Sequence, residues 1–253
     1  MDSQEYHIEA LQENHWWFRG RNQLLKSLVD DFAQGHKVQK INTIVDVGCG
    51  VGLNADTLKG YTENLIGIDP DDIAIGYCQN KGYNKVIQST LEELTPEKIQ
   101  QPVDVVVAMD ILEHLPDDLL GVKRIFQLVS VGGMAIITAP AFPSIHGLQD
   151  IVSHHYRRYK RKQLSDLCRA AGFEIVRTTY FNTWLFAPIA LIRYAMRFWK
   201  PANLQSENQF NSPLINSILT RMFALEMGTI IRGMNYPFGV SLLVVVKKTE
   251  NNF

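Results

Sequence analysis

One stretch of the chain, IVDVGCGVGLNADTL at residues 44–58, joins a β-branched run, three closely spaced glycines and the start of an amphipathic segment. Gly48, Gly50 and Gly52 remove side chains where the backbone has to turn sharply, and they let a ligand approach closely. Amide groups at the start of a following helix are free to bind an anionic group. The stretch therefore predicts a strand, a tight turn and a helix, with a ligand at the turn.

Beyond this turn, short β-branched runs alternate with amphipathic stretches, which is typical of a parallel sheet with helices on both faces. The sequence therefore predicts an α/β fold. Helices are expected over residues 2–35 and near 52–60, 71–81, 91–99, 117–130 and 160–171. Strands are expected at Thr43–Val47, Asn64–Ile68, Lys85–Gln88, Val103–Ala108, Met134–Ala139, Phe173–Tyr180 and 240–248.

The chain of 253 residues is long enough for one large α/β domain with an elaborated end. About fifty residues without a clear strand separate the last two predicted strands, so they are expected to form a helical insertion rather than a turn. We expect a single domain over residues 1–253. Its parts are an N-terminal helical lid (1–40), a ligand-binding core (41–182), a helical cap (183–239) and a last strand (240–248).

Composition limits the partners and the location of the protein. The net charge of −1 gives no overall field that would attract nucleic acid. Three widely spaced cysteines share no metal-ligand spacing, so reduced thiols and no metal site are expected. The N-terminus is polar rather than a secretory signal, and no uncharged apolar run reaches the ~18 residues of a membrane-spanning helix. We therefore expect a cytoplasmic protein.

Two acidic residues narrow the ligand expected at the turn. Asp69 ends the second predicted strand, where an acidic residue of a doubly wound fold binds ribose hydroxyls; alternatively it caps the helix from Asp71. Asp46 ends the first strand, and its carboxylate would repel a pyrophosphate but attract the ammonium and sulfonium of S-adenosylmethionine. A dinucleotide fingerprint also needs glycine at position 53, where Leu53 stands. S-adenosylmethionine is therefore favoured over a nicotinamide dinucleotide.

Further segments make the chain resemble the class I S-adenosylmethionine-dependent methyltransferases. Besides VDVGCGVG and IGIDP, it has VVVAMDILEHLPDD at 105–118 and LVSVGGMAIITAPA at 128–141. The segments at 13–25 (ENHWWFRGRNQLL) and 149–176 are similar to a subgroup of small bacterial methyltransferase-domain proteins. The resemblance implies a doubly wound, Rossmann-like, mostly parallel seven-stranded sheet with an antiparallel last strand, N-terminal helices and a helical insertion. It also implies S-adenosylmethionine as cofactor and S-adenosylhomocysteine as product.

The resemblance assigns roles to residues at the predicted carboxyl ends of the strands. The backbone of the turn would cradle the methionine moiety, the second strand end would hold the ribose, and the loop after the third strand would border the adenine. The end of the fourth strand would line the site beside the methyl donor. The residues concerned are Asp46, Gly48, Gly50 and Gly52 at the turn, Asp69 and Pro70 at the ribose, Ser89, Thr90 and Leu91 at the adenine, and Met109 and Asp110 beside the donor.

An aromatic and basic cluster, HWWFRGR at residues 15–21, precedes the core. Trp17 and Phe18 are as well explained by packing of an N-terminal helix as by function. Trp16, Arg19 and Arg21 are predicted to form a lid over the adenosine or to bind the cofactor carboxylate, because aromatic and guanidinium groups suit both tasks.

A second basic segment, HHYRRYKRK at residues 154–162, has three interpretations: a solvated loop before a helix, a weakly supported RNA contact, or recognition of the methyl acceptor. In the third, Arg157 or Arg158 would bind a carboxylate or phosphate. His155 would then be the general base and Asp150 would orient it. The histidines His114 and His146 are weaker candidates for a catalytic role.

The insertion at 183–235 carries aromatic and basic residues on apolar segments. It is interpreted as a cap over the acceptor pocket, or alternatively as a peripheral contact with the inner face of a membrane. The acceptor would be a small molecule or lipid-like, methylated on oxygen or nitrogen. Two other functions stay open: a non-catalytic membrane or protein-interaction module that retains the fold, and a nicotinamide-dependent oxidoreductase.

Overall fold

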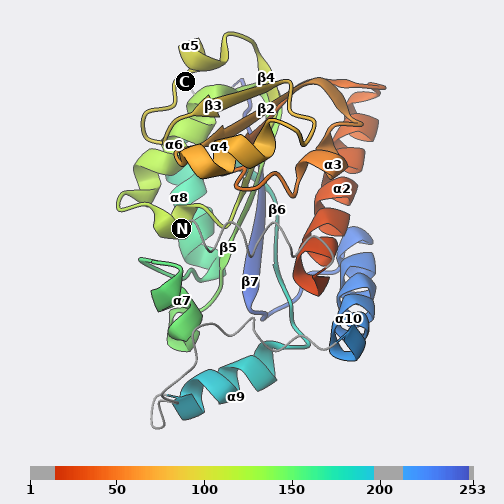
Figure 1. Cartoon of the computed structure of the whole chain (residues 1–253), viewed down its shortest axis with the longest axis vertical. Helices are drawn as coiled ribbons and strands as arrows, with labels where there is room; N and C mark the ends of the chain where they lie inside the picture. The colour runs from red at the N-terminus through yellow and green to blue at the C-terminus, as the bar shows by residue number, and fades with distance from the viewer. Residues whose placement is uncertain (1–14, 197–212, 251–253) are drawn as a thin grey trace.

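The structure, a computed structural model, describes residues 15–196 and 213–250, and its centre is a seven-stranded sheet (Figure 1). The strand order is β3-β2-β1-β4-β5-β7-β6, in which only β7 runs antiparallel to its neighbours. This topology confirms the predicted doubly wound fold. The strands are β1 (Ile41–Val47), β2 (Thr62–Asp69), β3 (Lys85–Gln88), β4 (Val103–Met109), β5 (Val129–Pro140), β6 (Glu174–Phe181) and β7 (Ser241–Lys247).

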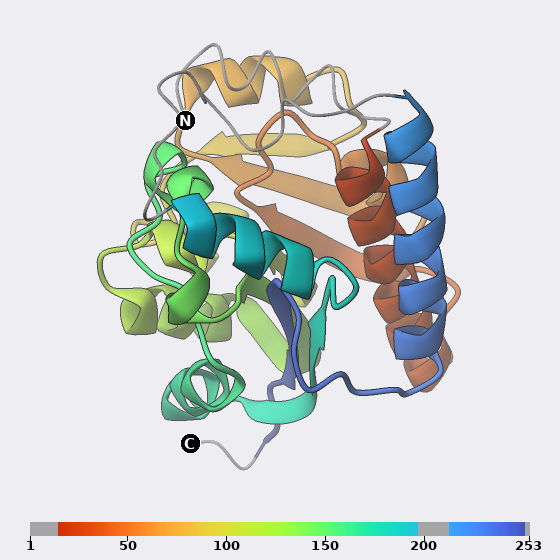
Figure 2. The same ribbon diagram turned by 90° about the horizontal axis from the view of Figure 1, so that it is seen from below.

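Helices cover both faces of the sheet, and each face has its own apolar core (Figures 1 and 2). On one face α2 (Trp16–His36), α3 (Ala55–Leu58) and α10 (Pro213–Ile231) pack against the strands, and on the other α6 (Asp118–Leu128) and α8 (Arg161–Ala170) do so. The remaining helical segments are α4 (Asp72–Cys78), α5 (Pro96–Ile99), α7 (Leu148–Val152), α9 (Phe186–Met196) and the short 3-10 turns η1 (Leu112–His114) and η2 (Pro143–Ile145).

Strand β4 has apolar side chains on both faces of the sheet, so helices have to cover both faces. Val105 and Val107 contribute to the core beneath α2 and α10, whereas Val106 and Ala108 contribute to the core beneath α6 and α8. All four side chains are fully buried. A strand that is apolar at successive positions is stable only when both of its faces are covered, as in parallel sheets.

Helix α2 runs without a break through Gly20, in agreement with the helix predicted for this part of the chain. A Cβ atom on Gly20 would lie 1.6 Å from Cδ1 of Phe223 on α10. The glycine therefore allows α2 and α10 to pack closely, and Figure 2 shows the two helices side by side. The part of the predicted N-terminal helix before residue 15 lies outside the described residues.

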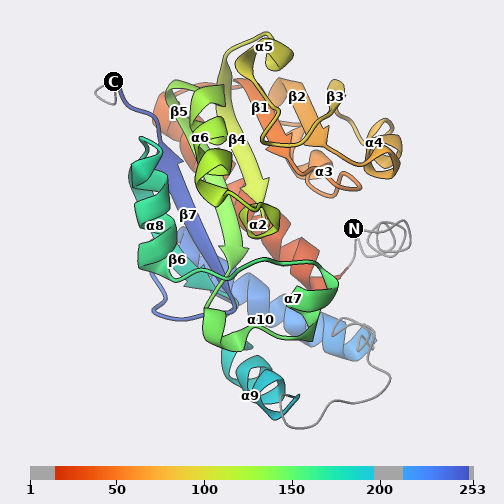
Figure 3. The ribbon, with the colours of Figure 1, turned by 90° about the vertical axis from the view of Figure 1, so that its left-hand side faces the viewer.

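The insertion contains α9 and α10, which lie near the ends of β6 and β7 (Figure 3). Residues 197–212 of the predicted cap lie outside the described residues. By length and composition α10 could cross a membrane, although it contains Arg221 and Glu226. One face of α10 is buried against the sheet and α2 through Phe223, Met227 and Ile230, as expected of a helix that covers a core.

Candidate functional site

The three glycines of the turn after β1 all adopt left-handed backbone conformations. Their φ angles are +67° at Gly48, +52° at Gly50 and +81° at Gly52. A Cβ atom at Gly48 would lie 2.0 Å from Cδ1 of Ile111, and one at Gly52 would lie 3.0 Å from Cβ of Lys81. The turn therefore requires glycine both for its conformation and for its space.

The amide groups of this turn are bound inside the protein rather than free for a ligand. Gly48 and Cys49 both donate to the carbonyl oxygen of Ile68, at 2.7 and 3.0 Å, and Gly52 donates to Cys49 at 2.9 Å. The helix that follows, α3, has only four residues. The tight turn uses these amides itself, so they do not form an anion site, and anion binding at the start of α3 stays a prediction. What the turn offers a ligand is close approach to the backbone.

Asp46 at the end of β1 is completely buried, and neutral donors satisfy its carboxylate. Its oxygens accept hydrogen bonds from the Tyr83 hydroxyl at 2.6 Å and from Nδ2 of Asn54 at 3.1 and 3.3 Å. Burial raises the pKa of Asp46 to about 6, although these two hydrogen bonds act in the opposite direction. Asp46 therefore fixes the turn, and any attraction it exerts on a cation acts without direct contact.

Asp69, at the end of β2, links the second strand to the glycine turn. One carboxylate oxygen accepts the Gly50 amide at 2.9 Å and the other accepts the Asp71 amide at 3.0 Å. Burial raises the pKa of Asp69. The N-cap of α4 is Asp71 rather than Asp69, since the Asp71 side chain accepts the amide of Ile73. The neighbouring Pro70 is exposed, at the rim of the site.

The loop after β3 borders the same edge of the sheet, next to the end of β2. The backbone amide of Ser89 donates to the carbonyl oxygen of Asp69 at 3.1 Å, and the Ser89 hydroxyl accepts a hydrogen bond from Lys98. Thr90 is half-buried. The side chain of Leu91 lies in the apolar core beneath α6, so only its backbone is placed to border an adenine.

The end of β4 brings a carboxylate to the centre of the edge. Met109 is buried in the core, and Asp110 follows it with a positive φ of 58°. Asp110 forms an ion pair with Arg21 of α2 at 3.2 Å and accepts a hydrogen bond from the Thr138 hydroxyl. The Nε atom of Arg21 is buried and has no hydrogen-bond partner among the described residues. This nitrogen is available to a ligand anion.

The remaining members of the N-terminal cluster do not surround the ribose and adenine positions. Trp16 and Trp17 pack against Phe223, with ring centroids 5.6 Å apart in both cases, and Trp17 also stacks on Phe181 at the end of β6. Trp16 therefore lies on the β6 side of the sheet, away from the expected adenosine position beside β2, and a role for it over the adenosine stays a prediction. Arg19 is exposed and forms no ion pair within the part of the chain that the structure describes.

The predicted pair of Asp150 and His155 is present, and two arginines support it. Nδ1 of His155 lies 2.9 Å from Oδ1 of Asp150, whose other oxygen accepts the Gly147 amide at 2.7 Å. Arg158 donates to Asp150 at 2.7 Å, and Arg193 of α9 lies 3.5 Å away. Burial alone would raise the pKa of Asp150, but the hydrogen bond from His155 and the charge of Arg158 hold it well below its usual range. His155 is thereby held in one orientation.

The other basic residues of the 154–162 segment are held by internal partners. Arg157 pairs with Asp118 at 2.9 Å, and Arg158 is buried against Asp150 and the carbonyl oxygen of Ala141. These contacts contradict the prediction that Arg157 or Arg158 is free to bind an acceptor anion. They attach the segment to the core.

Glu113 and His114 form a part of the site that the sequence interpretation underrated. They lie in η1, directly after β4, and the imidazoles of His114 and His155 meet edge to face with centroids 4.7 Å apart. Glu113 is fully buried, and neither of its carboxylate oxygens has a hydrogen-bond partner among the described residues. Burial raises the pKa of Glu113 well above its usual range and lowers that of His114 to about 4. The pattern Glu-His after a buried strand was the available signal.

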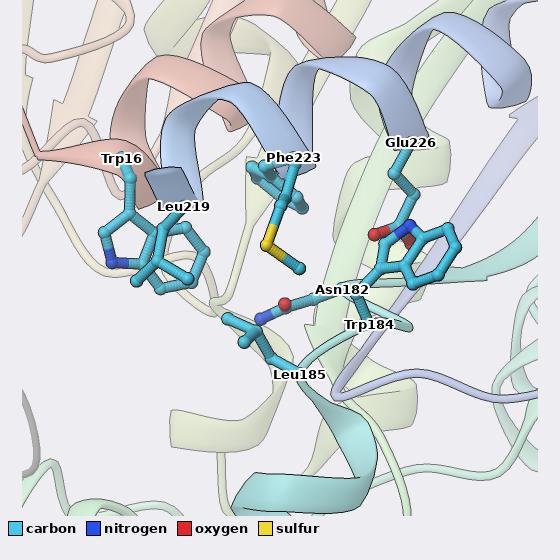
Figure 4. Close-up of a pocket in the computed structure, with 8 residues that line it drawn as sticks. Trp16, Asn182, Trp184, Leu185, Leu219, Phe223 and Glu226 are labelled. Atoms are coloured by element: carbon cyan, nitrogen blue, oxygen red, sulfur yellow. The ribbon is translucent and has the colours of Figure 1, made fainter. Parts of the chain in front are cut away.

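A small aromatic pocket lies between the start of α2, the segment after β6 and α10 (Figure 4). Most of its lining is apolar, but Glu226 contributes a buried carboxylate that accepts the Thr183 amide at 2.9 Å. The pocket shows that Trp16 lies on the β6 side of the sheet. It is lined by Trp16, Asn182, Trp184, Leu185, Leu219, Met222, Phe223 and Glu226.

The outer faces of α9 and α10 expose large apolar side chains. Leu191 on α9 and Leu214 and Leu225 on α10 are each at least 70% exposed. Such surfaces suit either a partner or a lipid surface. Peripheral membrane contact through 183–235 stays a prediction.

Known proteins resemble this chain in both sequence and structure. A family model described as a methyltransferase domain matches residues 17–178. A probable S-adenosylmethionine-dependent methyltransferase of Mycolicibacterium smegmatis is 27% identical over 172 residues, which are 66% of this chain and 63% of the relative. A ubiquinone biosynthesis O-methyltransferase of Nitrosomonas europaea is 26% identical over 188 residues, covering 63% of this chain and 77% of the relative. The chain thus spans less than two thirds of the mycobacterial relative.

Among solved structures, a chain from the complex between the Haloferax volcanii Trm112 methyltransferase activator and a methyltransferase aligns with a TM-score of 0.62 at 14% identity. The alignment covers 98% of this chain and 96% of that one. A SAM-dependent methyltransferase from Archaeoglobus fulgidus aligns with a TM-score of 0.55 at 17% identity, covering 95% and 99%. At these identities the two alignments support the fold alone.

Proposed function

The chain belongs to the methyltransferase domain family, and from this premise we propose that it transfers a methyl group to a hydroxyl of a small, largely apolar acceptor. Its cofactor is S-adenosylmethionine, which supplies a methyl carbon activated by a positively charged sulfur. The acceptor atom and the roles of individual residues go beyond what family membership implies.

The observation that carries the proposal is the charge of the edge around the glycine turn. Asp46, Asp69 and Asp110 lie at the ends of three adjacent strands, β1, β2 and β4, and four of the five turn amides at residues 48–52 are already bound. A pyrophosphate would find carboxylates and few free donors here, whereas a sulfonium and an ammonium are attracted. The same observation disfavours the alternative of a nicotinamide-dependent oxidoreductase.

The chemical types of the residues at this edge of the sheet suit the parts of S-adenosylmethionine. The glycine turn leaves space for the methionine moiety, Asp69 would accept hydrogen bonds from the ribose, and the backbone of the Ser89–Leu91 loop would border the adenine. The buried, unpartnered Nε of Arg21 would bind the cofactor carboxylate. Most of the work of such a protein is to align the acceptor with the methyl carbon.

In the proposed reaction, His155 takes the proton of the acceptor hydroxyl. Because the ionised Asp150 accepts a hydrogen bond from Nδ1, the proton of neutral His155 is assigned to that nitrogen and Nε2 keeps its lone pair. Nε2 therefore acts as the base while the acceptor oxygen bonds to the methyl carbon. Asp150, with Arg158 behind it, is a positioning residue in this step.

Two observations support a hydroxyl on an apolar acceptor. The pocket beside Trp16 and Trp184 has aromatic and aliphatic walls on the β6 side of the sheet, and with a volume of about 10 Å³ it would have to open to admit such an acceptor. The relative from Nitrosomonas europaea carries the name of an O-methyltransferase of ubiquinone biosynthesis. A base such as His155 is needed for a hydroxyl acceptor more than for an amine that loses its proton to water.

Mass spectrometry of cell extracts incubated with the protein and isotopically labelled S-adenosylmethionine tests the proposal. We expect a labelled, apolar product whose methyl group is an ether, and His155→Gln should reduce its formation by 10²–10⁴-fold, as for loss of a general base. A product labelled on nitrogen, or no product at all, would contradict the proposal. The second result would favour the non-catalytic module with the same fold.

A further inference from the structure

We infer that Glu113, His114 and His155 form a binding site for a divalent transition-metal ion of the zinc type. One ligand atom from each residue can be chosen such that all three lie within 4.8 Å of one another. Two imidazole nitrogens and one carboxylate are a common set of protein ligands for catalytic zinc, which leaves further coordination positions open. From the sequence no metal site was expected, because the three residues come from two separate segments.

The buried carboxylate of Glu113 is the independent observation that points to a cation. Its two oxygens have no hydrogen-bond partner among the described residues, although the side chain is fully buried. A buried carboxylate without a partner is costly, so such groups are normally paired or coordinate a metal. Arg158 is a nearby positive charge that favours the ionised carboxylate of Glu113, but its guanidinium donates to Asp150 and Ala141 and forms no hydrogen bond with Glu113.

The surroundings of His155 match those of a metal-binding histidine. Such histidines usually donate their second ring nitrogen to a carboxylate, which fixes the ring and raises its basicity. Nδ1 of His155 makes this contact with Asp150 at 2.9 Å, and Asp150 is itself held by Arg158 and the Gly147 amide. Nε2 of His155 is therefore the nitrogen left for the ion, beside the ring of His114.

The spacing of the ligand atoms is slightly wide for a bound ion. Ligands 2.0–2.2 Å from a tetrahedral zinc lie about 3.3–3.6 Å apart, so a separation of 4.8 Å has to close by about 1.2–1.5 Å. The site lies in η1 directly after β4, next to the Asp110–Arg21 pair at the predicted donor site.

The position of the cluster suggests what the ion does, and this part rests on the proposed methyl transfer. An open coordination position would hold the acceptor hydroxyl and lower its pKa, so that its proton leaves to solvent. His155 would then act as a ligand rather than as the base. The ion would thus select acceptors with a hydroxyl that can reach the η1 turn.

Cobalt binding tests the site without any need for activity. The full-length protein is stripped with a chelator and titrated with Co²⁺, whose visible absorption reports coordination by nitrogen and oxygen, and Zn²⁺ is then added as competitor. We expect one ion per chain, displaced by Zn²⁺, and at least a tenfold loss of affinity in Glu113→Gln and in His155→Gln. His154→Asn is the matched control, because this exposed neighbour lies outside the cluster.

The outcomes separate this inference from the proposed function. No Co²⁺ absorption by the wild-type protein, or equal affinity in Glu113→Gln and His154→Asn, would overturn the metal site. Circular dichroism identifies a variant that has lost its fold, and the wild-type titration decides the question even then. If the stripped protein still methylates its acceptor at the full rate, the ion has no part in methyl transfer and His155 as general base survives, while the titration alone decides whether the site binds a metal.

Discussion

The two halves of the site lie along the same edge of the sheet but are built in different ways. The cofactor half comes from turns that directly follow β1, β2 and β4. Its residues are linked by hydrogen bonds to one another, such as the bond from the Gly50 amide to Asp69. The acceptor half is assembled from α7, the 154–162 segment and α9, which meet at Asp150, and from η1, which joins them through the contact of His114 with His155. One half depends on the backbone of short motifs, and the other depends on buried charges contributed by distant segments.

This difference determines how each half responds to change. Substitutions in the cofactor half should act mainly on ligand affinity, because the backbone shape of the turn is what a ligand meets. Substitutions in the acceptor half should act first on stability, because removal of one buried charge leaves the others without compensation.

Asp150→Asn should be the most destabilising of these changes. It leaves the buried guanidiniums of Arg158 and Arg193 without their carboxylate, and breaking a buried ion pair in this way costs about 3–5 kcal/mol. Urea unfolding followed by circular dichroism measures the loss. Asp166→Asn serves as control, since its ion pairs are exposed and no measurable change is expected. Equal stability of the two variants would refute the role of Asp150 as the centre of the acceptor half.

Asp46 should make the stability of the cofactor half depend on pH. The fold raises its pKa from 3.8 to about 6, so it favours the protonated carboxyl. The resulting stabilisation is complete below pH 3.8 and is lost as the pH rises to about 6, a change of up to about 3 kcal/mol. Urea unfolding of wild type and Asp46→Asn between pH 4 and 7.5 should show the variant gaining relative stability with pH. A constant difference would contradict this prediction.

A pair of glycine substitutions separates backbone strain from the ligand site. Gly48→Ala and Gly132→Ala both place a methyl group at a positive φ, and each should cost about 1–2 kcal/mol of stability. Only the first should also weaken S-adenosylmethionine binding, by tenfold or more, because its Cβ displaces Ile111 at the turn. Gly132 has open space around it. Calorimetric titration of both variants tests this, and equal affinities would remove the turn from the binding site.

Substitutions at the two arginines of the N-terminal cluster should have different effects on S-adenosylmethionine affinity. The difference should be smaller than that between the two glycine variants. Arg21→Gln is expected to weaken S-adenosylmethionine binding several-fold, since it removes the partner of Asp110 and a donor for the cofactor carboxylate. Arg19→Gln should leave the affinity unchanged, because Arg19 is exposed. Fluorescence titration of the two variants side by side is sufficient, and a larger effect at Arg19 would reverse the assignment.

The same contrast explains what could be predicted from the sequence. All seven strands were predicted to within a few residues, because β-branched runs and the glycines between them act locally. The Asp150–His155 contact was also predictable, since five residues separate the two. The placement of Trp16 against Phe223 depends on how two helices separated by almost 200 residues pack, and no local pattern encodes it. The cluster of Glu113 with His155 depends in the same way on where the 154–162 segment crosses η1.

Binding of S-adenosylmethionine to the purified wild-type protein tests the central claim most directly. Isothermal titration calorimetry should show one site per chain with micromolar-range affinity, competition by S-adenosylhomocysteine, and weaker binding by Asp69→Ala. Wild-type protein that is folded by circular dichroism yet releases no heat and binds no S-adenosylmethionine would contradict the account.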